Sequence, residues 1–159
     1  MTQLVDCRDG DFLWILGAEP VTPGLRLPPG GIDSLEIIQI VRGMAKSVYA
    51  SHDRGAWMMV EDSEVVGLCS YKAAPDEEGA VEIGYGVAPA RRKQGHATRA
   101  VAAMLDIARD DPAVKVVLAV TSVDNPASQR CLIANGFVET DRTDDPEDGP
   151  VILWMRALD

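Results

Sequence analysis

The sequence has few cysteines and no long apolar segment. Its three cysteines, Cys7, Cys69 and Cys131, are odd in number and scattered, and none belongs to a CxxC pair. An odd count argues against a complete disulfide framework, and the spacing does not fit a cysteine-based metal site. No apolar run is long enough to span a membrane, and the first residues lack the charged-then-apolar layout of a secretory signal. We therefore expect a cytoplasmic protein.

Basic residues are scarce as well. The chain has 15 lysines and arginines against 25 aspartates and glutamates, which gives a formal net charge of −10. This balance disfavours nucleic acids and anionic membranes as partners. It is compatible with a cationic ligand such as an amine, although solubility alone also explains an acidic composition. The acidic stretch 141–148 lacks the spaced Asp-x-Asp-x-Asp-Gly order of a calcium loop, so we expect no metal site there.

The length of 159 residues suits one ordinary domain, and we expect residues 1–159 to form it. Short apolar or alternating runs predict strands at 12–16, 56–60, 65–72, 80–87, 115–120, 137–140 and 151–157. Helical spacing and capping residues predict helices from Asp33 to about Tyr49, at 95–110 and at 125–134. Residues 141–150 are expected to form a flexible, solvated loop. This order of elements predicts a mixed α/β domain.

One basic segment stands out in the acidic chain. Arg91–Arg99 holds four basic residues and no acid, and it lies between a predicted strand and a predicted helix. Free N–H groups of a first helical turn and the helix dipole both favour a phosphate there. The P-loop pattern GxxxxGKS or GxxxxGKT is absent, and the Gly84–Pro89 run fails the GxGxxG pattern because proline occupies its last position. The segment therefore predicts a phosphorylated small molecule as ligand.

Within this segment, Arg92, Gly95 and Ala97 fit the pattern Arg/Gln-x-x-Gly-x-Gly/Ala. This pattern resembles the pyrophosphate-binding loop of the GNAT acetyltransferase superfamily. The context agrees with the resemblance, because Glu82-Ile83-Gly84-Tyr85 precedes the loop on a predicted strand and a helix follows it. Downstream, Asn125-x-x-Ser128 and Gly136-Phe137 resemble the helix and corner that close the superfamily's cofactor cleft.

The resemblance covers roughly residues 56–157 and is strongest to the branch that includes ribosomal-protein N-terminal acetyltransferases. It implies a GNAT-like fold, with a central, mostly antiparallel mixed sheet that is flanked by helices and splayed at the cofactor cleft. It also implies acetyl-CoA as the acyl donor, with the pantetheine arm in the gap. The cofactor-binding residues implied are Val87, Arg92, Lys93, Gln94, Gly95, His96, Ala97, Thr98, Asn125 and Ser128. His96 is expected to act through its backbone.

The resemblance further implies the catalytic groups. Glu82 occupies the strand position of the superfamily's frequent general base, and a carboxylate in a partly dry cleft suits deprotonation of an amine. The alternative for Glu82 is a solvated or salt-bridged strand residue. A main-chain N–H in residues 85–87 is expected to polarise the thioester carbonyl. Many members carry a tyrosine on the last helix as general acid, but Leu132 stands at that position. Ser128 or a water could substitute, or the thiolate could leave unprotonated.

These residues predict an acetyl-CoA-dependent N-acetyltransferase in which a primary amine attacks the thioester directly. A non-catalytic acyl-CoA-binding sensor or subunit is the main alternative, and a small nucleotide-binding protein is a weaker one. A peptide N-terminus, a small polyamine and an aminoglycoside all remain open as the acceptor. Two sheet-edge strands are compatible with a homodimer.

Overall fold

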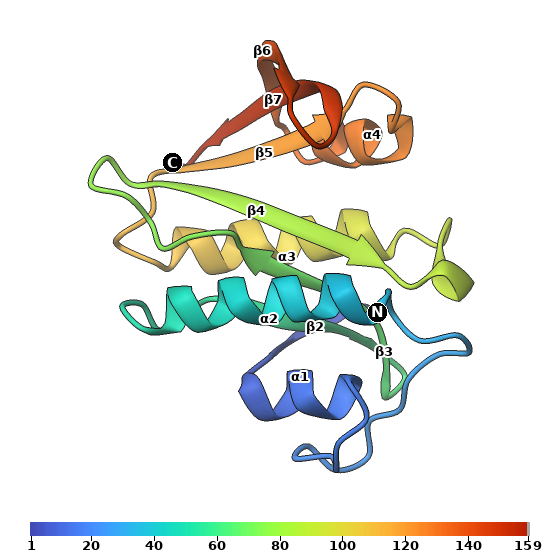
Figure 1. Ribbon diagram of the computed structural model, residues 1–159. Coiled ribbons are helices and arrows are strands. Elements are labelled where there is room, and N and C mark those ends of the chain that lie inside the picture. The colour runs from blue at the N-terminus through green and yellow to red at the C-terminus, as the bar shows by residue number, and fades with distance from the viewer. Residues whose placement is uncertain (159) are drawn as a thin grey trace.

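A single mixed sheet forms the centre of the computed structural model, which describes residues 1–158. Its strand order is β1-β2-β3-β4-β5-β7-β6, and every neighbouring pair is antiparallel except β4 and β5. The strands are β1 (Gln3–Asp6), β2 (Ala56–Glu61), β3 (Glu64–Tyr71), β4 (Ala80–Val87), β5 (Val116–Ser122), β6 (Val138–Asp145) and β7 (Gly149–Ala157). The predicted fold class, a mostly antiparallel mixed sheet flanked by helices, is confirmed (Figure 1).

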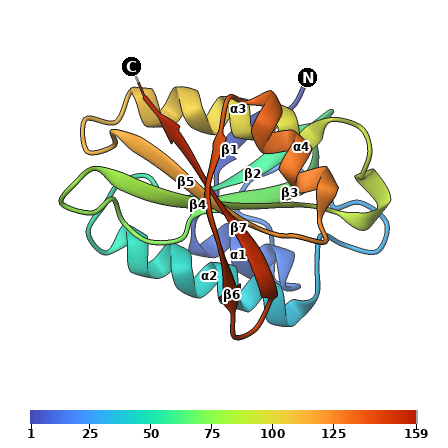
Figure 2. The same ribbon diagram turned by 90° about the horizontal axis from the view of Figure 1, so that it is seen from above.

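Helices cover both faces of this sheet. The helices are α1 (Asp9–Ile15), α2 (Leu35–Tyr49), the short 3-10 helix η1 (Pro89–Arg91), α3 (His96–Arg109) and α4 (Pro126–Ala134). Figure 2 shows α1 and α2 on one face and α3 and α4 on the other. Within residues 1–158, no helix is long and apolar enough to cross a membrane.

The two faces of the sheet carry separate hydrophobic cores, because successive strand side chains point to opposite faces. On β2, Met58 packs in the cluster with Phe12 and Ile38 from α1 and α2. The neighbouring Trp57 and Met59 instead pack in the cluster with residues of α3. An apolar stripe of α3 is buried there, with Ala100, Val101, Met104, Leu105 and Ala108 all at most 3% exposed.

Two predictions at the ends of the chain are wrong. Residues 12–16 were expected to form a strand, but Phe12 and Ile15 lie in α1 and are buried together, one helical turn apart. A short apolar run fits a buried helix as well as a strand. The strand that occupies this edge of the sheet is β1, and the sequence analysis predicts no strand there. Residues 141–150 are mostly paired strand of the β6–β7 hairpin rather than a loop.

The sheet opens at one pair of strands. β4 and β5 are in register only at Ala80–Val116, Val81–Val117 and Glu82–Leu118. Beyond Glu82, β4 continues along β3 while β5 continues along β7, so the two strands separate. Figure 1 shows β4 and β5 diverging from their shared end. The predicted splay is therefore present, and its walls are the last residues of β4 and β5.

Candidate active site

The gap beside β4 receives main-chain groups of that strand. The N–H of Lys72 donates to the carbonyl of Glu82, and the N–H of Ala88 donates to the carbonyl of Val66, both at 2.8 Å. The even-numbered residues of β4 therefore point their main-chain groups toward β3. Because consecutive strand residues point these groups in opposite directions, Tyr85 and Val87 direct theirs into the gap. A carbonyl bound in the gap would find main-chain donors at this wall.

The loop that follows η1 presents a row of free main-chain donors. From Arg92 to Thr98, no main-chain N–H donates to an acceptor within residues 1–158. Lys93 and Gly95 adopt left-handed conformations with φ of 63° and 81°, and Gly95 caps the start of α3. Unpaired N–H groups at the positive end of a helix dipole form an anion site. The loop thus has the geometry that a phosphate group requires.

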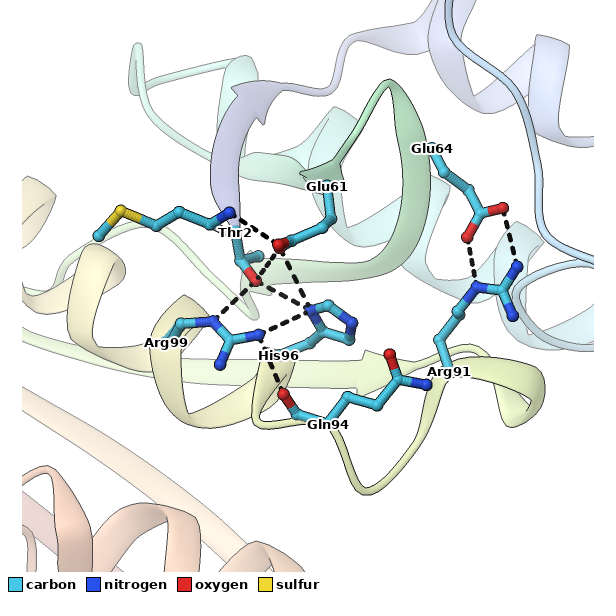
Figure 3. Close-up of polar contacts among 8 residues, drawn as sticks. Thr2, Glu61, Glu64, Arg91, Gln94, His96 and Arg99 are labelled. Atoms are coloured by element: carbon cyan, nitrogen blue, oxygen red, sulfur yellow. Dashed lines mark hydrogen bonds and ion pairs between the residues drawn. The ribbon is translucent and has the colours of Figure 1, made fainter.

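The basic side chains of this segment have different roles. Arg92 and Lys93 are exposed at the loop. The Arg92 side chain makes one contact, in which Nε donates to the carbonyl of Val87 at 3.3 Å. Arg91 is instead held by Glu64 through two hydrogen bonds of 2.5 and 3.1 Å, and this contact lowers the pKa of the Glu64 carboxyl (Figure 3). Arg92 and Lys93 are therefore the cations available to an anion at the loop.

A polar network connects the loop to β1 and β2 (Figure 3). The His96 side chain is 4% exposed, and its Nδ1 lies 2.9 Å from the hydroxyl of Thr2. Arg99 Nη2 donates to the carbonyl of Gln94 at 3.0 Å and lies 3.2 Å from His96 Nδ1. Its Nε donates to Thr2 at 3.1 Å. Arg99 of α3 thus holds the carbonyl of Gln94, and Thr2 near the start of the chain contacts both Arg99 and the ring of His96.

The ring of His96 takes part in several polar contacts. Its Nδ1 lies within hydrogen-bond distance of both Thr2 Oγ1 and Arg99 Nη2, and Thr2 Oγ1 in turn donates to Glu61 Oε2 at 3.0 Å. Burial, and then the charge of Arg99, lower the pKa of His96, while the carboxylate of Glu61 at 3.7 Å opposes this shift. The ring of His96 therefore has a structural role that the sequence reading did not assign to it.

Glu82 forms a cross-strand ion pair. Its Oε2 lies 2.8 Å from Nζ of Lys72, the residue opposite it on the neighbouring chain segment after β3. Both side chains are partly exposed, at 35% and 40%. The Lys72 stem crosses Gly84, where an added Cβ would lie 3.2 Å from its Cε. The salt-bridged alternative for Glu82 is thus present. Glu82 pairs with Leu118 at the last register position of β4 and β5, where the strands begin to separate, and it is not among the lining residues of the cavity described below, whereas Lys72 is.

Helix α4 forms the wall opposite β4. Its first residues follow the predicted caps, since Pro126 occupies the first turn and Asn125 Oδ1 accepts from the N–H of Ser128 at 3.2 Å. Leu132, at the expected position of a tyrosine acid, is fully buried. Tyr85 of β4 reaches this wall, and its hydroxyl lies 2.7 Å from Ser128 Oγ. This contact joins residues 43 positions apart and carried no signal in the sequence.

A cavity of about 420 Å³ connects these walls. Its lining comes from α2, β3, β4, β5 and α4 and includes Gly84, Tyr85, Gly86, Asn125 and Ser128. Ile37, Val41 and Met44 of α2 line the side away from the loop. The charged residues of the lining are Asp33, Lys72 and Asp148. The site therefore combines an anion-binding loop, a gap with free main-chain donors, and a chamber of mixed polarity whose α2 side is apolar.

Solved structures share this fold at low sequence identity. An aminoglycoside acetyltransferase AAC(6')-Ib in complex with coenzyme A superposes with a TM-score of 0.69 and 17% identity, over 99% of this chain and 95% of that one. A GNAT-family acetyltransferase from Streptococcus pneumoniae gives 0.70 and 13%, over 100% of both chains. RimL, a ribosomal L7/L12 alpha-N-protein acetyltransferase in complex with coenzyme A, gives 0.66 and 19%, over 79% and 74%.

Sequence comparison gives the family. The Bacillus subtilis (strain 168) protein described as uncharacterized N-acetyltransferase YjdG is 29% identical over 85 residues, which are 52% of this chain. The match spans about half of that relative, 51% of its length. The family model for the acetyltransferase (GNAT) domain matches residues 28–138, which include the whole of β4, the loop and α3. The chain therefore belongs to the GNAT acetyltransferase family.

Proposed function

We propose that the protein transfers an acetyl group from acetyl-CoA to a primary amine by direct attack. The observation that carries the proposal is the row of unpaired N–H groups from Arg92 to Thr98, next to the separated strands β4 and β5. Such a row binds a diphosphate, and the gap beside it has the free main-chain donors that a pantetheine arm pairs with. The proposal extends the family membership to a particular donor and reaction.

The residues at the loop fit the diphosphate of coenzyme A. Gly95 takes a φ of 81°, and an added Cβ would lie 2.7 Å from Nη1 of Arg99, so the loop needs a glycine at this position. The N–H groups of Gln94, Gly95, His96, Ala97 and Thr98 would hold the diphosphate, with Arg92 and Lys93 adding positive charge. Val87, Asn125 and Ser128 would pair with the pantetheine arm from the two walls of the gap.

The reaction centre follows from β4. In the proposal, Glu82 accepts the proton that the attacking ammonium must lose, directly or through water. The main-chain N–H groups of Tyr85 and Val87, which face the gap, donate to the thioester oxygen as negative charge develops on it. Lys72 Nζ holds one oxygen of the Glu82 carboxylate through their 2.8 Å contact.

The chamber favours one class of acceptor. Its lining has two carboxylates and one ammonium, and its α2 side is apolar, with Ile37 of that helix 42% exposed. A polycation needs several carboxylates, and Lys72 repels a second ammonium. We therefore propose a primary monoamine with an apolar body as the acceptor. This separates the chain from neighbours whose titles name aminoglycosides, such as AAC(6')-Ib.

Release of free thiol from acetyl-CoA, measured with a panel of amines, tests the proposal. The expected result is thiol release that depends on the amine and yields one acetylated amine per thiol. Acetyl-CoA binding without turnover on any amine would favour the sensor alternative. Absence of both binding and turnover would refute the proposal, and protection from thermal unfolding by ATP but not by CoA would favour a nucleotide-binding protein.

A further inference from the structure

The proposed reaction leaves one proton unassigned. When the bond between carbonyl carbon and sulfur breaks, the sulfur keeps the electron pair and needs a proton. Leu132 cannot supply one, because its side chain has no acidic hydrogen and is fully buried. The other hydroxyls of the cavity lining, on Ser70, Thr121, Ser122 and Ser128, are aliphatic alcohols, and Tyr85 carries a phenol. A phenol is the more acidic type of hydroxyl, so Tyr85 is the candidate donor.

Tyr85 places a hydroxyl where that donor is needed. Its backbone lies on the β4 wall of the gap, while its hydroxyl lies against the first turn of α4, 2.7 Å from Ser128 Oγ and 3.4 Å from the Ser128 carbonyl. Both residues line the cavity. Burial raises the pKa of Tyr85, and the hydrogen bond to Ser128 offsets only part of that shift, so the phenol keeps its proton at neutral pH.

We propose that the Tyr85 hydroxyl is the general acid of this enzyme and that Ser128 positions it. This inference rests on the proposed function. In the step, the amine nitrogen forms a bond to the carbonyl carbon, the carbon–sulfur bond breaks, and sulfur takes the phenolic proton of Tyr85. The ammonium loses one proton to Glu82 before attack, the nitrogen loses a second to water as the amide forms, and the tyrosinate regains one from solvent. Two protons leave nitrogen and one reaches sulfur, so the products are an amide, a free thiol and one proton released to solvent.

The contact with Ser128 gives each hydroxyl a distinct part. Ser128 Oγ can accept from Tyr85 when the phenol is not donating to sulfur, and it can donate to the tyrosinate once the proton has left. The helix start beneath Ser128 also favours the negative charge on the tyrosinate. Tyr85 of β4 thus supplies the acidic hydroxyl that α4 lacks at Leu132. Ser128 contributes by positioning that hydroxyl.

The test compares Tyr85→Phe with Tyr71→Phe, a matched control. Tyr71 is fully buried on the adjacent strand, and within residues 1–158 its hydroxyl has no hydrogen-bond partner. We expect Tyr85→Phe to lower kcat by about 10²-fold with little change in the KM for acetyl-CoA, and Tyr71→Phe to retain wild-type kcat. The kcat defect of Tyr85→Phe should shrink with acetyl thioesters of more acidic thiols, whose thiolates leave without a proton. Ser128→Ala should cost less than Tyr85→Phe.

A binding measurement gives a second readout. Calorimetry with CoA and with desulfo-CoA, which lacks the sulfur, reports the contact between the phenol and the thiol. Tyr85→Phe should weaken CoA binding but leave desulfo-CoA binding unchanged, whereas a merely structural role would weaken both equally. If the wild type is active, an unchanged kcat in Tyr85→Phe would overturn this inference but not the proposed function. A larger loss of kcat in Ser128→Ala than in Tyr85→Phe would do the same. An inactive wild type would instead overturn the proposed function.

Discussion

At the scale of single residues, the proposed chemistry depends on small features of one strand and one loop. Glu82, Tyr85 and Val87 lie on β4, and the main-chain groups of consecutive residues point to opposite sides of the strand. Glu82 shares its face with Gly84, over which the Lys72 stem lies, and with Gly86, where an added Cβ would meet no atom within 4 Å. The main-chain groups of Tyr85 and Val87 point into the gap instead. One short strand thus presents both the proposed base and the proposed main-chain donors.

Glu82→Gln removes the base without changing the shape of the side chain. The amine should then keep its proton longer, and kcat should fall by about 10²-fold while acetyl-CoA affinity stays at the wild-type value. Glu139→Gln is the matched control, because Glu139 also forms an ion pair, with Arg142, but lies on β6, which pairs with β7 and not with β4. Thiol release and calorimetry measure the two quantities. Equal kcat in Glu82→Gln and wild type would exclude Glu82 as the base.

Gly95→Ala tests the loop geometry. A Cβ at a φ of 81° is strained, so the loop should deform and acetyl-CoA affinity should fall; the Arg99 guanidinium, 2.7 Å from the added Cβ, would also have to move. Gly43→Ala is the control, since an added Cβ there, in the exposed interior of α2, meets no atom within 4 Å. That change should stabilise the protein by about 0.5–1 kcal/mol and leave affinity unchanged. Calorimetry and thermal unfolding distinguish the two variants. Unaltered affinity in Gly95→Ala would contradict the role of the loop.

At the scale of elements, the loop and α3 are coupled to β1 and β2 through buried polar groups. His96 and Arg99 lie on the first turn of α3, Thr2 precedes β1, and Glu61 ends β2. These contacts fix the carbonyl of Gln94 and leave the N–H groups of the loop free. The contacts of His96, Arg99 and Thr2 therefore help to hold the loop in the conformation that leaves its N–H groups free.

Protonation of His96 should loosen this arrangement. Its pKa is lowered in the folded protein, so the neutral ring contributes stability that is fully present above the unfolded pKa of about 6.5 and is lost as pH falls below it. His96→Asn keeps a polar side chain at this position that does not titrate. The melting temperature of the wild type should therefore fall more steeply than that of His96→Asn between neutral pH and pH about 5. Parallel curves for the two proteins would argue against this coupling.

Local patterns predicted the elements that local interactions determine. The stripe and glycine cap of α3, the caps of α4 and the bounds of β4 were readable because capping, periodicity and strand alternation act over a few residues. The run at residues 12–16 was misassigned because its few apolar residues suit a helix or a strand, and tertiary packing on α2 decided the outcome. The Tyr85–Ser128 contact needs the three-dimensional separation of β4 from β5, which no local pattern encodes.

At the scale of the whole molecule, charge is unevenly distributed around the sheet. The chain carries a formal net charge of −10, yet the loop after β4 exposes Arg92 and Lys93, and the chamber lining carries only three charged residues. An anionic donor is therefore attracted to one end of the gap by a local positive region. The acidic remainder of the surface favours approach of a cationic acceptor from the other side.

The acceptor proposal predicts a preference among amines. 2-Phenylethylamine should give a higher kcat/KM than spermidine or neamine, because one ammonium and an apolar body fit the chamber. Ile37→Ser should raise the KM for 2-phenylethylamine by about tenfold, since Ile37 lines the cavity. Ile40→Ser should not, because Ile40 is exposed on the same helix outside the lining. Steady-state kinetics measures these values, and faster turnover of the polyamines would refute the assignment while preserving the proposed reaction.

The central claim is that the main-chain N–H groups from Arg92 to Thr98 bind the diphosphate of acetyl-CoA. Amide NMR spectra of the labelled protein, recorded with CoA and with pantetheine, which lacks the diphosphate, measure this binding most directly. We predict that CoA shifts the amide resonances of these residues strongly and that pantetheine leaves them unchanged. If CoA binds while those resonances stay in place and others shift, the diphosphate lies elsewhere and the account is contradicted.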